Sequence, residues 1–112
     1  DAAIEPSKFT VAPSKAIKEL VLKTDSNLED IDLFEINEAF SMVPIVNTNI
    51  LNINDKKVNI NGGAVSLGHP LGCSGARILT TLIHNLHRLK KEKGIAAICN
   101  GGGGASSVQI KI

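Results

Sequence analysis

Apolar residues recur at helical spacing in two well-separated parts of the chain. Residues 13–24 place Ile17, Leu20 and Val21 on one side of a predicted helix. Residues 75–89 predict a longer helix, because five apolar residues fall on a single stripe. These five are Ile78, Leu79, Leu82, Leu86 and Leu89.

Shorter apolar runs between and after these segments predict strands. Residues 31–36 form a run bounded by acidic residues, and residues 94–99, "GIAAIC", predict a buried strand. The last residues, up to Ile112, alternate apolar and polar positions and predict a half-buried strand antiparallel to the one before it. "KKVNI" at residues 56–60 predicts a brief further strand. Nothing before residue 13 supplies a strand, so we expect the sheet to lack its first one.

A helix is also predicted to follow the strand at residues 31–36. Asn37 stands where this helix would start, which is a favoured capping position. Pro44 removes a backbone donor inside the segment, so we expect a bend or irregular first turns. The residues expected to point inward are Ala39, Phe40, Val43, Val46, Ile50 and Leu51.

The order of these elements predicts an α/β fold with layers of helices on a mixed sheet. A chain of 112 residues suits one domain with a modest core, and 43% of its residues are apolar. The net charge of +1 argues against a nucleic-acid or membrane-surface partner. Two cysteines make no disulfide framework and fit no common zinc spacing, so we predict no metal site and a reducing compartment.

Glycine is concentrated around two reactive side chains. Nine of the ten glycines lie in residues 62–75 and 101–104, next to His69 and Cys99. Glycine is costly in regular structure and usually marks unusual backbone angles or close approach to a ligand. The glycine run matches neither common nucleotide-binding pattern. The clusters therefore indicate a site for another kind of chemistry.

Each reactive residue has two interpretations from its local context. His69 can take or give a proton in a reaction, or it can simply hydrogen-bond to a neighbouring turn. Cys99 can be a small buried hydrophobe, or a thiol beside glycine N–H groups that stabilise an oxyanion. Asn37 can cap a helix, or hold a ligand or water at the end of a strand. Cys73 is expected to fill a tight place. The reactive interpretation of His69 and Cys99 points to acyl transfer or proton abstraction beside a carbonyl.

Three motifs together resemble the C-terminal half of the thiolase family. They are "NEAF" at 37–40, "NGGAVSLGHPLGCSGAR" at 61–77 and "CNGGGG" at 99–104. The resemblance spans residues 1–112 and is greatest for the mitochondrial type of acetoacetyl-CoA thiolase. It implies a thiolase C-terminal domain, a homodimer or homotetramer, and a mitochondrial location, with the cytoplasm as the alternative.

The resemblance also implies roles for five residues. The substrates would be acetyl-CoA, acetoacetyl-CoA and CoA, with no separate cofactor. The residue matching His69 activates a nucleophilic cysteine, and the residue matching Asn37 positions a water in an oxyanion hole. The residue matching Cys99 moves the α-proton. The N–H of Gly101 would serve a second oxyanion hole, and Phe40 would line the acetyl pocket.

One departure from the family concerns the nucleophile. In thiolases this cysteine belongs to the N-terminal half, and neither Cys73 nor Cys99 matches its position. We therefore expect the chain to need an N-terminal thiolase domain as partner and to be inactive alone. Two alternatives stay open: a free-standing thiolase-like domain that binds acyl-CoA or a partner without catalysis, and a self-contained enzyme with Cys99 as nucleophile.

Overall fold

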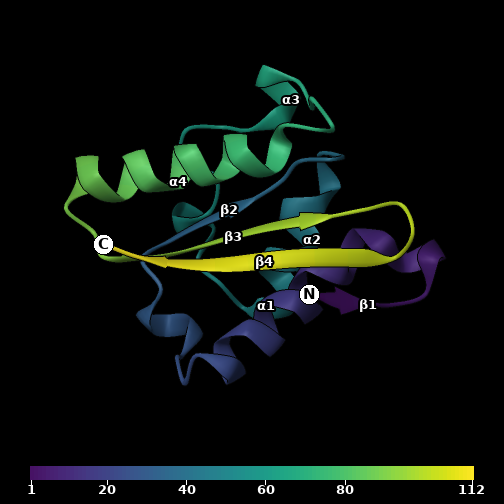
Figure 1. Ribbon diagram of the computed structural model, residues 1–112, viewed down its shortest axis with the longest axis horizontal. Coiled ribbons are helices and arrows are strands. Elements are labelled where there is room, and N and C mark those ends of the chain that lie inside the picture. Colours follow the sequence, from purple (N-terminus) through teal and green to yellow (C-terminus); the bar gives the residue numbers. More distant parts are fainter.

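A four-stranded mixed sheet forms the centre of the computed structural model, which describes residues 1–112 (Figure 1). The strands are β1 (Ala2–Ala3), β2 (Leu33–Ile36), β3 (Lys93–Cys99) and β4 (Gly104–Lys111). Their order across the sheet is β1-β4-β3-β2. β2 runs parallel to β3, whereas β4 is antiparallel to both β3 and β1.

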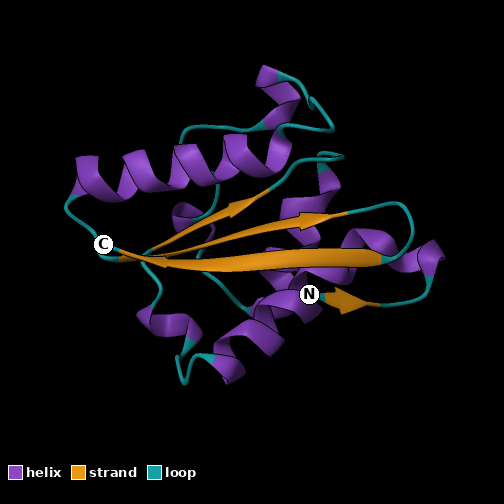
Figure 2. Cartoon of the chain, in the orientation of Figure 1, coloured by secondary structure: helices purple, strands orange, loops and turns teal.

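Helices cover both faces of this sheet (Figure 2). α4 (Ser74–Leu89) lies on one face, against β2 and β3, and α1 (Ala12–Lys23) and α2 (Met42–Leu51) lie on the other. Short helical turns fill the connections, and none of the helices could cross a bilayer. The turns are the 3₁₀ helices η1 (Pro6–Val11), η2 (Leu28–Asp30) and η3 (Asp55–Lys57) and the one-turn helix α3 (Ala64–Leu67).

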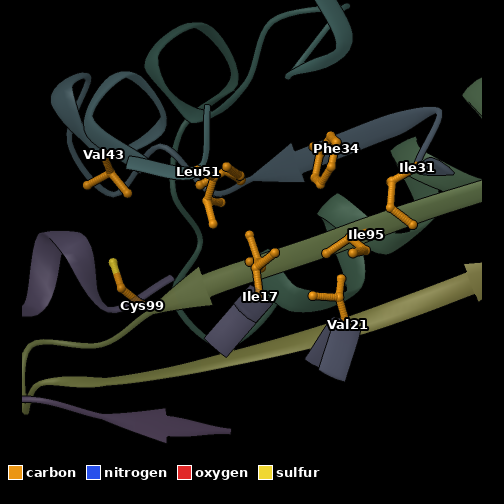
Figure 3. Close-up of a cluster of buried hydrophobic side chains, with 10 residues drawn as sticks. Ile17, Val21, Ile31, Phe34, Val43, Leu51, Ile95 and Cys99 are labelled. Atoms are coloured by element: carbon orange, nitrogen blue, oxygen red, sulfur yellow. The ribbon is translucent and has the colours of Figure 1, made fainter. Parts of the chain in front are cut away.

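Alternation along β2 divides the core into two clusters. Leu33 packs with the buried stripe of α4, while Phe34 and Ile36 pack on the opposite face, against residues of α1 and α2. Figure 3 shows the larger cluster, with Ile17 near its middle and Cys99 at one end. The catalytic candidate Cys99 is therefore also a core residue.

The main elements predicted from the sequence are confirmed. The long amphipathic helix, the buried strand of residues 94–99 and the antiparallel final strand all form, at α4, β3 and β4. The α/β class and the mixed sheet follow from them. α4 and β4 have a clear apolar periodicity, and β3 is a continuous apolar run bounded by Gly94 and Gly101.

The prediction for the helix after β2 is wrong at its start. α2 begins at Met42, so Asn37 does not cap it, and the Asn37 N–H instead donates to the carbonyl oxygen of Ala97 at 2.9 Å. Pro44 falls in the first turn, where its missing N–H costs no helical hydrogen bond and no bend is needed. Phe40 and Ile50 are 58% and 42% exposed and do not point into the core.

Two predictions about strands are also wrong. A strand does precede residue 13, because Ala2 and Ala3 pair with the beginning of β4. Residues 56–60 form no strand: η3 occupies their first part, and Val58 makes only an isolated parallel bridge with Phe34. Both segments are too short for periodicity to settle their structure.

Candidate active site

The parallel pairing of β2 and β3 brings the candidate residues to one edge of the sheet. Parallel strands end at the same edge, so Asn37 after β2 and Cys99 at the end of β3 lie at the same side. His69 reaches this edge from the loop between α3 and α4. In α/β sheets the carboxyl edge is where ligands usually bind.

A pocket of about 610 Å³ opens at this edge. Phe40, His69, Cys99 and Gly101 all line it, so four of the five residues singled out in the sequence share one cavity. Phe9, from η1, forms a further part of the wall and meets Phe40 edge to face, with ring centroids 6.0 Å apart. The cavity combines an apolar wall with an imidazole, a thiol and backbone amides.

Asn37 lies behind the His69 ring and outside the pocket lining. Its side chain is fully buried, and its Nδ2 is 3.5 Å from both ring nitrogens of His69. The Oδ1 of Asn37 is buried without a hydrogen-bond partner. An unpaired buried acceptor is costly, so this atom is suited to accept a hydrogen bond from a water or ligand.

The His69 ring is fixed through its Nδ1. The Ser74 hydroxyl lies 2.6 Å from Nδ1 and donates its single proton to the carbonyl oxygen of Pro70 at 3.1 Å. Its oxygen is thus left to accept the Nδ1 proton. We infer from this arrangement that Nδ1 carries the imidazole proton and that Nε2 holds the lone pair, which a general base requires.

Cys99 has a more apolar setting than the sequence indicated. The residue is 8% exposed and belongs to the same core cluster as Ile17 and Val43 (Figure 3). Burial raises the pKa of the Cys99 thiol above its ordinary value. The thiol form is therefore favoured at neutral pH, although His69 and the Gly101 amide line the same pocket.

Of the four consecutive glycines, only Gly101 lines the pocket. Its N–H donates no backbone hydrogen bond, and its Cα faces open space. Gly103 has φ +89° and packs directly against the backbone of Ile4, and Gly104 packs against the side chain of Asn100. Gly103 and Gly104 thus allow close packing in the β3–β4 loop, whereas Gly101 leaves a free backbone N–H near Cys99.

The family model of the thiolase C-terminal domain matches residues 1–112, the whole chain. The chain belongs to the thiolase family. The acetyl-CoA acetyltransferase named mitochondrial in Xenopus tropicalis is 54% identical over 112 residues, which are 99% of this chain and 26% of that protein. The one named cytosolic in Mus musculus is 55% identical over 102 residues, 91% of this chain and 26% of that protein.

Solved thiolase structures have the same fold. The Acat5 thiolase of Ascaris suum, solved in complex with coenzyme A, superposes with a TM-score of 0.92 and is 52% identical. The alignment covers 98% of this chain and 28% of that one. The chain thus spans about a quarter of the length of these relatives.

Sequence reasoning missed Ser74 in this thiolase domain. Ser74 is fully buried and its hydroxyl contacts His69. The neighbouring Cys73 was expected to fill a tight place, but it is exposed, so that prediction is wrong. The available signal was a hydroxyl five positions after the histidine, at the predicted start of α4. No group of three or more His, Cys, Asp or Glu side chains lies together as a metal site would need.

A buried ion pair beneath the site was also missed. Arg77, in the first turn of α4, places Nη1 3.6 Å from Oε2 of Glu35 on β2. Burial raises the pKa of Glu35 to about 7, an effect that Arg77 opposes and Glu38 increases. Strand periodicity gave no signal, since an acidic residue on a short strand ordinarily faces solvent.

Proposed function

We propose that this chain is the C-terminal catalytic part of an acetyl-CoA acetyltransferase. Such an enzyme joins two acetyl-CoA molecules into acetoacetyl-CoA and CoA, or runs the reverse cleavage with CoA. The observation that carries the proposal is the single pocket shared by His69, Cys99, Gly101 and Phe40, with Asn37 behind the imidazole. CoA thioesters are the substrates, and no separate cofactor takes part.

His69 is proposed to act through Nε2. Because Ser74 holds the Nδ1 proton, Nε2 can take a proton from a nucleophilic cysteine that an N-terminal domain would supply. The resulting thiolate attacks the acyl carbonyl and displaces CoA as a thiolate, which takes the proton of Cys99, while His69 keeps its new proton on Nε2. In the next step this Nε2–H donates a hydrogen bond to the enolate oxygen of the second substrate.

Cys99 is proposed to be the acid and base at the α-carbon. In condensation the departing CoA thiolate takes the Cys99 proton, and the Cys99 thiolate then removes the α-proton of the second acetyl-CoA. The enolate carbon attacks the acyl-enzyme carbonyl, and the nucleophilic cysteine leaves and takes back its proton from Nε2 of His69. In cleavage the Cys99 thiol returns a proton to the departing enolate. Burial favours the protonated thiol, the form that the cleavage direction uses first.

Two groups are proposed to stabilise the developing negative charge. A water bound to the unpaired Oδ1 of Asn37 would donate its second proton to the enolate oxygen. The free N–H of Gly101 would donate to the oxyanion formed at the acyl-enzyme carbonyl. Phe40, with Phe9 against it, would enclose the acetyl group.

The relatives are much longer than this chain, which supports a further domain in the same polypeptide. We propose that this is an N-terminal thiolase domain. From the family resemblance, we propose a homodimer or homotetramer as the assembly. Relatives of nearly equal identity are named mitochondrial and cytosolic. We propose a mitochondrial location, because the motifs resemble the mitochondrial subtype, with the cytosol as the alternative. Imaging of the full-length protein in cells would distinguish the two locations.

Acetoacetyl-CoA cleavage by the 112-residue chain and by the full-length protein tests the proposal. We expect CoA-dependent cleavage by the full-length protein, and none by the chain alone, in which neither Cys73 nor Cys99 matches the nucleophilic cysteine. Turnover by the chain alone would contradict it. So would a full-length protein that binds acetyl-CoA without turnover, which would favour the non-catalytic alternative.

A further inference from the structure

The Glu35–Arg77 pair joins the two elements that hold His69. Arg77 lies three residues after Ser74 in the first turn of α4, and Ser74 binds the Nδ1 of His69. Glu35 lies two residues before Asn37, whose side-chain amide nitrogen is 3.5 Å from both nitrogens of the same ring. The ion pair therefore connects the helix start and the strand end between which the imidazole sits.

The Glu35–Arg77 ion pair is not explained by a contribution to the stability of the fold. The two charged atoms are 3.6 Å apart, and the side chains of Arg77 and Glu35 are 18% and 2% exposed. Glu35 Oε2 and Arg77 Nε and Nη1 have no hydrogen-bond partner. A buried ion pair with incomplete hydrogen bonding is often no more stable than an apolar pair of the same volume. A cation in the first turn of a helix also opposes the helix dipole.

We propose that Glu35 and Arg77 are positioning residues that fix the start of α4 against the end of β2 and so set the orientation of the His69 ring. The consequence for catalysis rests on the proposed function, whereas the consequence for the imidazole does not. Neither residue lines the pocket, so neither is expected to touch substrate. Loss of the pair lets Ser74 move, and Nδ1 of His69 then loses its fixed acceptor.

A matched pair of double variants tests this role. Glu35→Gln with Arg77→Met removes both charges, so that neither is left buried alone. Asp32→Asn with Lys91→Met makes the same kind of change in the ion pair at the opposite end of α4, where the charged atoms are 3.4 Å apart. Both variants are made in the full-length protein and in the 112-residue chain, and folding is checked by circular dichroism.

The first readout is the tautomer of His69, measured by ¹⁵N NMR of the imidazole. We expect the wild-type protein and the Asp32/Lys91 variant to hold the proton on Nδ1, and the Glu35/Arg77 variant to show a mixture of tautomers. This readout needs no turnover, so it tests the positioning role even if the proposed function fails.

The second readout is acetoacetyl-CoA cleavage by the full-length protein. We expect the Glu35/Arg77 variant to lower kcat about tenfold or more while KM changes little, because loss of an orienting partner commonly costs 10- to 100-fold. A folded Glu35/Arg77 variant with wild-type tautomer and kcat would overturn the proposal. If that variant does not fold, Glu35→Gln alone removes the ion pair while keeping the size of the side chain, and a wild-type tautomer and kcat in it would likewise overturn the proposal.

Discussion

The Oγ of Ser74 lies 2.6 Å from Nδ1 of His69, and its own proton is donated to the carbonyl oxygen of Pro70. With the Ser74 proton on Pro70, Nδ1 carries the imidazole proton, and Nε2 holds the lone pair that the proposed base needs. This geometry depends on the first turn of α4 being held in place. The chemistry proposed for the pocket therefore begins with a serine that does not line it.

Replacing Ser74 by alanine removes the acceptor of the Nδ1 proton. We expect Ser74→Ala to lower kcat for acetoacetyl-CoA cleavage by the full-length protein about 10- to 100-fold, with KM little changed. Ser66→Ala is the control, since that hydroxyl donates to the carbonyl oxygen of Gly63 in the same connection without contacting His69. Equal kcat values for the two variants would rule out the orienting role of Ser74.

Alanine at Gly101 and Gly103 should have different effects on stability. The Cβ of an alanine at Gly101 meets open space, whereas one at Gly103 meets the carbonyl oxygen of Ile4 at a backbone φ of +89°. We expect Gly103→Ala to lower the free energy of unfolding by about 1–3 kcal/mol, and Gly101→Ala by less than about 0.5 kcal/mol. Urea unfolding of both variants measures this, and equal losses would contradict the different packing of the two glycines.

The two cysteines should react with alkylating reagents at different rates. Cys73 is exposed, whereas Cys99 is buried and has a raised pKa. Because the thiolate is the reactive form, we expect iodoacetamide at pH 7 to modify Cys73 at least about tenfold faster. Peptide mass spectrometry over a time course measures both rates. Faster modification of Cys99 would contradict this expectation, because it would mean that the sulfur is more exposed to solvent, or in a more polar environment, than its packing indicates.

The buried Glu35 should make stability depend on pH. Its pKa is about 7 in the folded chain, above the ordinary value of 4.5, because burial penalises the carboxylate. The folded state then binds more protons than the unfolded state, so the free energy of unfolding falls as pH rises from about 4.5 to about 7, by up to about 3 kcal/mol. Urea unfolding at several pH values should show this slope in the wild type and a flatter one in Glu35→Gln. Parallel curves would contradict it.

Part of the fold and part of the candidate site could be predicted from the sequence, for different reasons. α4 and β4 follow from repeated apolar positions, since burial of one face requires that repetition, whereas β3 follows from a continuous apolar run that is buried on both faces. His69 and Cys99 were found because glycines surround them. Their meeting in one pocket follows from the parallel pairing of β2 and β3, which the sequence indicates only through the order of the elements.

Residues that act through tertiary contacts could not be found in this way. Ser74, Glu35 and Arg77 belong to elements predicted from the sequence, but their importance lies in which side chain each one meets across the fold. Phe40 shows the reverse case. Helical periodicity placed it in the core, whereas α2 starts two residues later and Phe40 lines the pocket.

The decisive measurement is the location of the acetyl group after the full-length protein reacts with acetyl-CoA. In the proposed mechanism Cys99 is the acid and base, and His69 activates a cysteine outside residues 1–112. Peptide mass spectrometry of the trapped intermediate should therefore find the acetyl thioester on a cysteine of the N-terminal domain, with Cys99 unmodified. An acetyl thioester on Cys99 itself would contradict the account.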